Sequence, residues 1–304
     1  MAGYELATYE SENGPRAGII VGESVFDAAE LTGQPTYTSV LRILEDWARA
    51  NDILAGAAKK TGAGWKLKET HLRAPVLWPP AIYCAGANYR DHAAEMAKKL
   101  NRPQDPDPKL NGGRPWHFIK TSRSVTDPGA TVTATHYCKN LDWEIELTAV
   151  IGKPGKNIRV DDALEHVAGY TIANDISARD LGRRAEAAAG SPFSFDWTGQ
   201  KCFDGACPLG PWIVPADDIP DPQNLSLKLW VNDVIKQDSN TSEMIFTLAE
   251  QIAQLSIGMT LYPGDLILTG TPAGVGQGRG EFLKAGDVVK LEIERIGTLS
   301  NRIA

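Results

Sequence analysis

Between Leu141 and Thr148 apolar and polar residues alternate strictly, a pattern that few structures other than a β-strand accommodate. Leu141, Trp143, Ile145 and Leu147 alternate with Asp142, Glu144, Glu146 and Thr148. On a strand, Glu144 and Glu146 share one face with their Cα atoms about 7 Å apart, so one ion can reach both. No basic residue accompanies the acids in this row, and like charges in a row repel one another.

A second strand-like segment, Tyr170–Asn174, ends at Asp175 and brings a third carboxylate to a turn. Ligation by carboxylates alone, with no Cys or His nearby in sequence, favours Mg²⁺, Mn²⁺ or Ca²⁺ over zinc. The alternative interpretation is a solvated strand face and an unrelated Asp cap. Spacing alone favours that alternative, because short motifs match often by chance.

Composition narrows the possible partners. The chain has 304 residues and a net charge of −7, which argues against nucleic acid and anionic membrane as main partners. No apolar run reaches the length of a membrane span, and the first residues do not form a signal peptide, so we expect a cytoplasmic protein. Four cysteines that match no zinc spacing predict free thiols (Cys84, Cys138, Cys202 and Cys207).

The predicted fold class is β-rich α+β, with a boundary near Ala74 that separates a small N-terminal α+β domain (1–74) from a larger domain (75–304). The elements expected in the small domain are antiparallel strands over Tyr4–Tyr9 and Ala17–Val21 and a helix capped by Ser39 that continues toward Lys60. Those expected in the large domain include a hairpin turning at Asn232–Asp233 and a helix that starts at a capping box of Asn240 and Glu243 and continues to Leu255.

Several polar residues outside the acidic strand are candidates for chemistry. His92 and Glu95 are three residues apart on a predicted helix, so they share a face and suit a general base held by a carboxylate. An ordinary surface pair is the alternative, and without context it is favoured. Lys120 lies on a predicted strand after residue 116, and Lys201 is expected to open another strand. In GTPAGVG we expect a tight turn that presents backbone N–H groups and Thr271 to a ligand.

Residues 96–116 contain four prolines, two glycines and few large apolar residues. A long segment of this composition inside a compact domain predicts a mobile loop or lid. Because it follows Glu95 directly, its movement would affect the proposed His92–Glu95 pair.

Taken in order, the motifs of residues 75–304 resemble the fumarylacetoacetate hydrolase family. They are GANYRDHAAE, PWHFIK, DWEIELTAVIGK, GYTIANDISARD, GQKCFDGACPLGPW, YPGDLILTGTPAGVG and the closing GD and IG pairs. The resemblance implies a mixed β-roll or β-sandwich, homodimeric, that binds Mg²⁺, Mn²⁺ or Ca²⁺. It further implies the following roles: metal ligands at Glu144, Glu146 and Asp175, a water-activating dyad at His92 and Glu95, cations at Lys201 and Arg179, and substrate neighbours at Lys120 and Thr271.

The eponymous enzyme has a further Asp where Cys84–Ala87 stands here, so the chain resembles the three-carboxylate branch of acylpyruvate hydrolases and related isomerases and decarboxylases. That enzyme also has a Gln where Gly182 stands, so its exact substrate is not carried over to this chain. The function expected is metal-dependent hydrolysis of the C–C bond of a 2,4-dioxo acid, as in aromatic catabolism, releasing pyruvate. His92 would activate water, and Lys201 would stabilise the oxyanion.

Other functions remain open at this point. The same enolate chemistry serves ketonisation of a 2-hydroxydienoate or decarboxylation of oxaloacetate. An alternative of another class is a non-catalytic, Ca²⁺-dependent module that binds a small molecule. The presence of His92, Glu95 and Lys201 together favours an enzyme, because a binding module needs no base.

Overall fold

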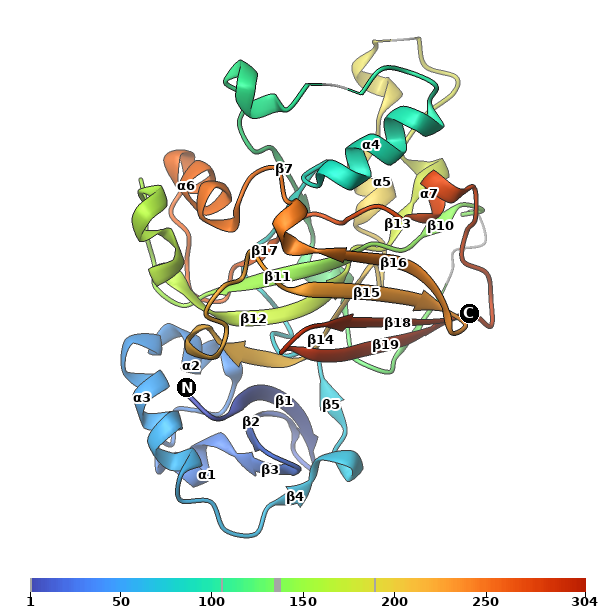
Figure 1. Ribbon diagram of the computed structural model, residues 1–304. Coiled ribbons are helices and arrows are strands. Elements are labelled where there is room, and N and C mark those ends of the chain that lie inside the picture. Colours follow the sequence, from blue (N-terminus) through green and yellow to red (C-terminus); the bar gives the residue numbers. More distant parts are fainter. Residues whose placement is uncertain (1, 105, 134–137, 189) are drawn as a thin grey trace.

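The computed structural model describes residues 2–104, 106–133, 138–188 and 190–304. Within these residues a large sheet runs through the molecule, and β5 and β8 attach to its sides at β1 and β14 (Figure 1). Its strands, in spatial order, are β4 (Trp65–Lys66), β3 (Ser24–Asp27), β2 (Gly14–Val21), β1 (Glu5–Ser11), β14 (Cys207–Pro215), β12 (Val167–Asn174), β11 (Ile145–Ile151), β17 (Leu266–Leu268), β6 (Ile82–Ala85) and β7 (His117–Lys120), with β5 (Leu72–Arg73) and β8 (Val125–Thr126) attached.

A second sheet packs against the middle of the first. Its order is β16 (Val234–Asn240), β15 (Ser226–Val231), β18 (Val288–Ile293), β19 (Gly297–Ile303) and β9 (Thr131–Val132), and a separate pair joins β10 (Leu141–Asp142) to β13 (Ser177–Ala178). The predicted hairpin is confirmed, since β15 and β16 are joined at Asn232 and Asp233, which both have positive φ. All four cysteines are free, as expected.

The sequence predicts one strand over Leu141–Thr148, whereas the structure divides it into β10 and β11. Between them, the backbone N–H groups of Glu144 and Ile145 donate to the side chains of Asn174 and Gln237 instead of a neighbouring strand. The alternative of a solvated face is wrong, because every residue of β11 is buried. Leu147 packs in the core between the two sheets, and Val150, on the acidic face, packs in a second core beneath the N-terminal helices.

The N-terminal unit forms as predicted, with β1 and β2 antiparallel. The helix capped by Ser39 is two helices, α2 (Val40–Glu45) and α3 (Trp47–Ala58), and α1 (Ala28–Thr32) precedes them. Because β1 pairs with β14 at Leu6 and Ile213, the large sheet continues across position 74. The domain boundary near Ala74 therefore stays a prediction.

The helix predicted from Asn240 is wrong at its start. Asn240 caps only a 3₁₀ turn, Thr241–Glu243, and α6 (Leu248–Gly258) begins later at a capping box of Thr247 and Glu250. The intervening backbone is not helical, because the N–H groups of Ile245 and Phe246 donate to the backbone and side-chain oxygens of Asn88 and not to a preceding turn.

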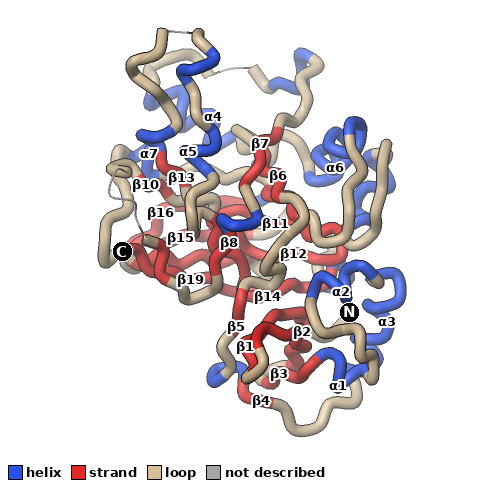
Figure 2. The backbone as a smooth tube through the Cα atoms, turned by 180° about the vertical axis from the view of Figure 1, so that it is seen from behind, coloured by secondary structure: helices blue, strands red, loops and turns tan. Residues whose placement is uncertain are grey.

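Three helices gather at the end of the molecule opposite β1–β4, namely α4 (Arg90–Lys99), α5 (Trp197–Lys201) and α7 (Gly276–Arg279) (Figures 1 and 2). Helix α4 occupies the first residues of the predicted loop, and a 3₁₀ turn, Pro108–Asn111, lies within the rest. None of the helices among the described residues has the length and apolar character needed to cross a membrane.

Candidate active site

The three predicted carboxylates meet at the end of the β11–β12 pair. Glu146 lies on β11 opposite Ala173 of β12, and Asp175, just beyond β12, donates its backbone N–H to the Glu144 carbonyl at 2.9 Å. Carboxylate oxygens of Glu144, Glu146 and Asp175 lie within 4.8 Å of one another, and all three residues are buried. We call these three residues the carboxylate cluster.

Three basic side chains approach this cluster. Lys201 places its Nζ 2.9 Å from Glu144 Oε2 and 2.5 Å from Asp175 Oδ2, and Lys120 Nζ lies 2.6 Å from Asp175 Oδ1. Arg179 pairs with Glu144 and, through Nε at 2.8 Å, with Asp142. Lys201 ends helix α5, so the prediction that it opens a strand is wrong. The helix forms because the Asp196 side chain caps it, accepting from Gly199 N at 2.8 Å.

Within the described residues Glu146 has no basic group at ion-pair distance, unlike Glu144 and Asp175. Burial, together with the charges of Asp175 and Glu144, raises the pKa of Glu146 well above its usual range. Burial acts the same way on Glu144, but Arg179 and Lys201 outweigh it and lower that pKa. A hard divalent cation would relieve the repulsion at Glu146, so the residues present fit the predicted ion.

The His92–Glu95 pair faces this cluster from helix α4. His92 Nδ1 lies 3.4 Å from Glu95 Oε2, and both oxygens of Glu95 accept from Gly274 N, at 3.0 and 3.1 Å. A Cβ atom at Gly278 would overlap the Glu95 carboxyl group, so the glycine lets this carboxyl group lie where it does. The loop before α7 thus holds the carboxylate that orients the histidine ring.

The GTPAGVG turn is present, but its N–H groups bind protein carboxylates. Gly270 N donates to Glu146 Oε2 at 2.7 Å, and Gly274 N donates to Glu95. Thr271 lines the cavity, with its hydroxyl accepting from Gln237 Nε2 at 2.9 Å. One turn therefore contacts both the carboxylate cluster and the His92–Glu95 pair.

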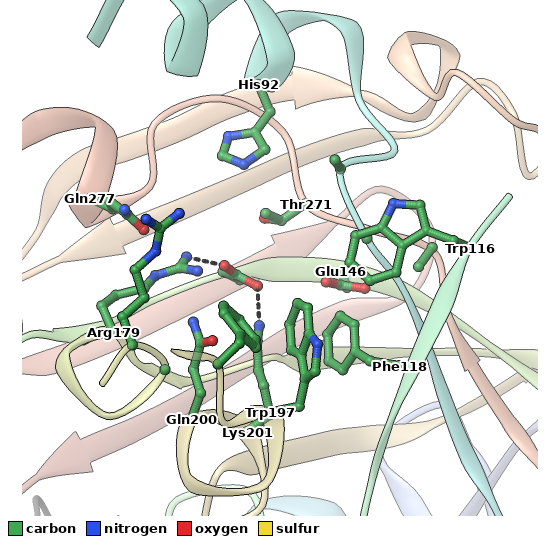
Figure 3. A pocket seen from close by; sticks show the side chains of 17 residues that line it. His92, Trp116, Phe118, Glu146, Arg179, Trp197, Gln200, Lys201, Thr271 and Gln277 are labelled. Atoms are coloured by element: carbon green, nitrogen blue, oxygen red, sulfur yellow. Dashed lines mark hydrogen bonds and ion pairs between the residues drawn. The ribbon is translucent and has the colours of Figure 1, made fainter. Parts of the chain in front are cut away.

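These groups surround one cavity of about 260 Å³, below the roughly 300–1,000 Å³ of sites for drug-sized ligands. Figure 3 shows His92 facing the cavity from the helix side, opposite Lys201. Of the predicted site residues, Glu144, Glu146, His92, Arg179, Lys201 and Thr271 line it. Lys120 and Asp175 lie behind them, both with fully buried side chains, and Glu95 lies behind His92.

Sequence reasoning missed several residues of the cavity wall. One side is aromatic, with Phe118 stacked on Trp197 at 4.9 Å between ring centroids and Trp116 5.5 Å from Trp197. The missed residues that line the cavity are Trp116, Phe118, Gly182, Arg183, Phe195, Trp197, Gln200 and Gln277. Most of them lie in the polar segment after Asp180, where no periodicity marks a strand or helix, while Trp116 and Phe118 lie at the start of a predicted strand whose pattern does not indicate a cavity.

Asp142 was also missed as a site residue. It is buried and its two oxygens accept from four donors, which are the backbone N–H groups of Trp143, Gly276 and Gln277 and the Nε of Arg179. Its place in the alternating acidic pattern was the available signal. Asp142 therefore links the first residues of α7 to Arg179 through hydrogen bonds.

Comparison with known proteins relates this geometry to one family. Residues 81–304 match the family described as fumarylacetoacetate (FAA) hydrolase C-terminal. The human protein oxaloacetate tautomerase FAHD2B, mitochondrial, is 42% identical over 237 residues, which are 77% of this chain and 70% of that protein. Oxaloacetate tautomerase YisK of Bacillus subtilis is 40% identical over 267 residues, 86% of this chain and 81% of that protein.

Solved structures agree with the sequence comparison. A 2-hydroxyhepta-2,4-diene-1,7-dioate isomerase from Mycobacterium marinum superposes with a TM-score of 0.72 at 32% identity, covering 99% of this chain and 98% of its own. Maleylpyruvate hydrolase from Sphingobium sp. SYK-6, in complex with manganese(II) and pyruvate, gives a TM-score of 0.74 at 28% identity with the same coverage.

Proposed function

The chain belongs to the fumarylacetoacetate hydrolase family, as its motifs predict, and we propose that it is a divalent-metal-dependent tautomerase of a small 2-oxo acid of the oxaloacetate type. The observation that carries the proposal is the placement of His92 across one small cavity from the carboxylate cluster. The curated relatives named oxaloacetate tautomerases support this reaction above the C–C hydrolysis that the sequence motifs suggest.

Glu144, Glu146 and Asp175 would hold the ion, which when bound supplies Lewis-acid stabilisation of negative charge on the 2-oxo oxygen. Arg179 and Lys201 keep Glu144 ionised, whereas burial and the neighbouring carboxylates disfavour the charged form of Glu146, which a bound ion would favour. Burial disfavours the charged form of Lys201, but Asp175 and Glu144 outweigh it and raise its pKa, so Lys201 stays a cation beside them. Gly270 N fixes the free end of Glu146.

His92 would move the proton. With Nδ1–H donating to Glu95, Nε2 carries the lone pair and acts as the base. Nε2 takes a proton from C3 of the keto acid, and the electrons of that C–H bond form the C2=C3 double bond while the carbonyl pair moves to the 2-oxo oxygen. Returning the proton to that oxygen completes the enol, and the reverse sequence restores the ketone.

C–C hydrolysis of a 2,4-dioxo acid is the second candidate. The similarity to maleylpyruvate hydrolase favours it, and the His92–Glu95 pair can equally accept a proton from water. The two reactions differ in whether water enters the cavity. The carboxylate cluster serves both reactions, so the substrate decides which of the two the enzyme catalyses.

The test is an assay of both reactions on one preparation. We expect the protein to accelerate loss of the enol absorbance of oxaloacetate, to lose this activity after exhaustive chelation, and to regain it with Mg²⁺ or Mn²⁺. Release of pyruvate from a 2,4-dioxo acid is measured in parallel. Full tautomerase activity in a verified metal-free sample, or none in the loaded protein, would overturn the proposal.

A further inference from the structure

The cavity wall also carries polar groups that the proposed reaction leaves unused. Arg183 and Gln200 both line it, Arg183 from the loop after Arg179 and Gln200 from helix α5. In Figure 3, Gln200 and Gln277 lie on the side of the carboxylates where Arg179 lies, away from Trp116 and Phe118.

Arg183 differs from the other cations of the cavity. Arg179 and Lys201 each contact two carboxylates. Arg183 has no ion pair or side-chain hydrogen bond with any residue that the structure describes, and its only recorded pairing is a backbone bridge to Phe195. Its guanidinium therefore keeps five N–H donors and a full charge available to a ligand in the cavity.

Gln200 supplies a second observation. The residue is 6% exposed, and its Oε1 is buried without a hydrogen-bond partner among the described residues. The amide lies against Gly182, where a Cβ atom would overlap Oε1, so the absence of a side chain at 182 makes room for it. Oε1 is an acceptor, so it can pair only with a donor such as water, whereas the two N–H donors of the same amide are the groups that a carboxylate can bind.

The charge balance of the site indicates what binds there. Five carboxylates belong to the site (Asp142, Glu144, Glu146, Asp175 and, beside His92, Glu95), and three cations (Lys120, Arg179 and Lys201) pair with the first group. A divalent ion at the carboxylate cluster would bring this sum to zero. Arg183 stands outside these pairs, so its charge is left for a carboxylate of the ligand other than the one beside the ion.

We propose that Arg183 and Gln200 form the subsite for a second carboxyl group of the substrate, so that the enzyme selects dicarboxylic 2-oxo acids. Arg183 binds this carboxylate through its planar pair of N–H groups, and the Gln200 amide donates to the same group. The inference rests on the proposed function for the identity of the reacting end. It adds the residues of this chain that recognise the other end.

The test compares oxaloacetate with its ester at the second carboxyl group. Arg183→Gln is expected to lower kcat/KM for oxaloacetate by about 10- to 100-fold, the size of a hydrogen bond to a charged group. For the ester the same variant should change kcat/KM by no more than about threefold, as at an exposed charge. Arg183→Lys should recover part of the loss, and Gln200→Leu should show a smaller loss confined to the acid.

Arg159→Gln is the matched control, because Arg159 is an exposed arginine paired with Asp162 and does not line the cavity. It should leave both substrates unaffected. Equal loss on acid and ester in Arg183→Gln would make Arg183 structural, and no loss on either would place the second carboxylate elsewhere. A wild-type preference for the ester would assign selectivity to the aromatic wall instead.

Binding gives a readout that does not depend on turnover. With Mn²⁺ present, malate should bind more weakly to Arg183→Gln than to the wild type by the same factor, whereas lactate, which lacks the second carboxyl group, should bind both equally. If the wild type failed to tautomerise oxaloacetate, the proposed function would fail, and the malate-to-lactate ratio would still decide the subsite.

Discussion

The carboxylate cluster and the His92–Glu95 pair face the same cavity but are held in different ways. The cluster lies at the end of two adjacent antiparallel strands, so the register that pairs Glu146 with Ala173 also brings Asp175 to Glu144. The pair lies on α4, and its geometry depends on Gly274 and Gly278, about 180 residues later in the chain. The first site is set by local pairing, and the second is set by a distant loop.

This difference predicts how each region responds to substitution. Changes in the cluster should alter ion binding, because its side chains are fully buried and surrounded by fixed charge. Changes around the pair should alter turnover and leave the ion in place. If the two regions act separately, some variants should lose ion binding and others should lose turnover while they still bind the ion.

The largest effect is expected from Glu146→Gln. Loss of a direct ligand should weaken Mn²⁺ binding by at least about 100-fold, because mutation of a residue that only hydrogen-bonds a metal ligand already lowers the affinity by about 10- to 100-fold. Tautomerase activity should vanish. Without an ion, the same variant should be as stable as the wild type or more stable, because one buried repelling charge is removed. Calorimetry with Mn²⁺ and thermal unfolding measure the two effects.

The control for Glu146→Gln is Glu165→Gln, which makes the same change at an exposed side chain paired with Lys153. It should alter neither quantity. Undiminished Mn²⁺ affinity in Glu146→Gln would remove Glu146 from the set of ligands and leave the cluster without an ion-binding role.

His92→Ala tests the other region. A general base contributes about 10²–10⁴-fold, so kcat should fall by that factor while Mn²⁺ affinity stays at the wild-type value. Steady-state kinetics and calorimetry on the same preparation measure both. A parallel loss of ion binding would make His92 a metal ligand and erase the difference between the two regions.

Gly278→Ala should disturb the pair without changing either of its members. The added Cβ would overlap the Glu95 carboxyl group and displace it, and a misplacement of about 1 Å can cost up to 10²-fold, so we expect kcat to fall by about 10- to 100-fold. Mn²⁺ binding should not change. Gly258→Ala, where a Cβ meets open space at the end of α6, is the matched control. Normal kcat in Gly278→Ala would show that the present position of the Glu95 carboxyl group is not needed for turnover.

Sequence patterns predicted the cluster well because strand periodicity and register act over a few residues. They could not show that Glu146 is buried, since its face is covered by a second core built from N-terminal residues such as Leu6 and Ile43. They placed Lys201 on a strand because nothing in the local pattern indicates that Asp196 caps a short helix. Arg183 and Gln200 were missed for a similar reason, since their approach to the cavity depends on tertiary packing around Gly182.

The segment after Glu95 is a third region that faces the cavity, and it is held more weakly than the strands of the carboxylate cluster. The lid predicted over 96–116 is tethered at Asp107, 3.5 Å from Arg90, and at Lys109, 2.7 Å from Glu250. Ion pairs that solvent still reaches, as here, contribute about 0–1 kcal/mol each, so the tethers should open readily in the free protein. We expect the lid to close over the cavity when ligand binds, because proton transfer to an enolate requires stray water to be excluded.

Hydrogen exchange measures this closure. In the free protein the amides of 107–111 should exchange fast, and adding Mg²⁺ with oxalate should slow them by about fivefold or more, the equivalent of about 1 kcal/mol. The amides of Ile145–Ile151, buried in β11 beside the cluster, should be protected in both states. Their protection without ligand follows from the pairing of β11 with β12 and β17, which no ligand has to complete. Protection of 107–111 that is already complete without ligand, or unchanged by saturating oxalate, would make the segment a fixed part of the cavity wall, and both regions would then be equally rigid.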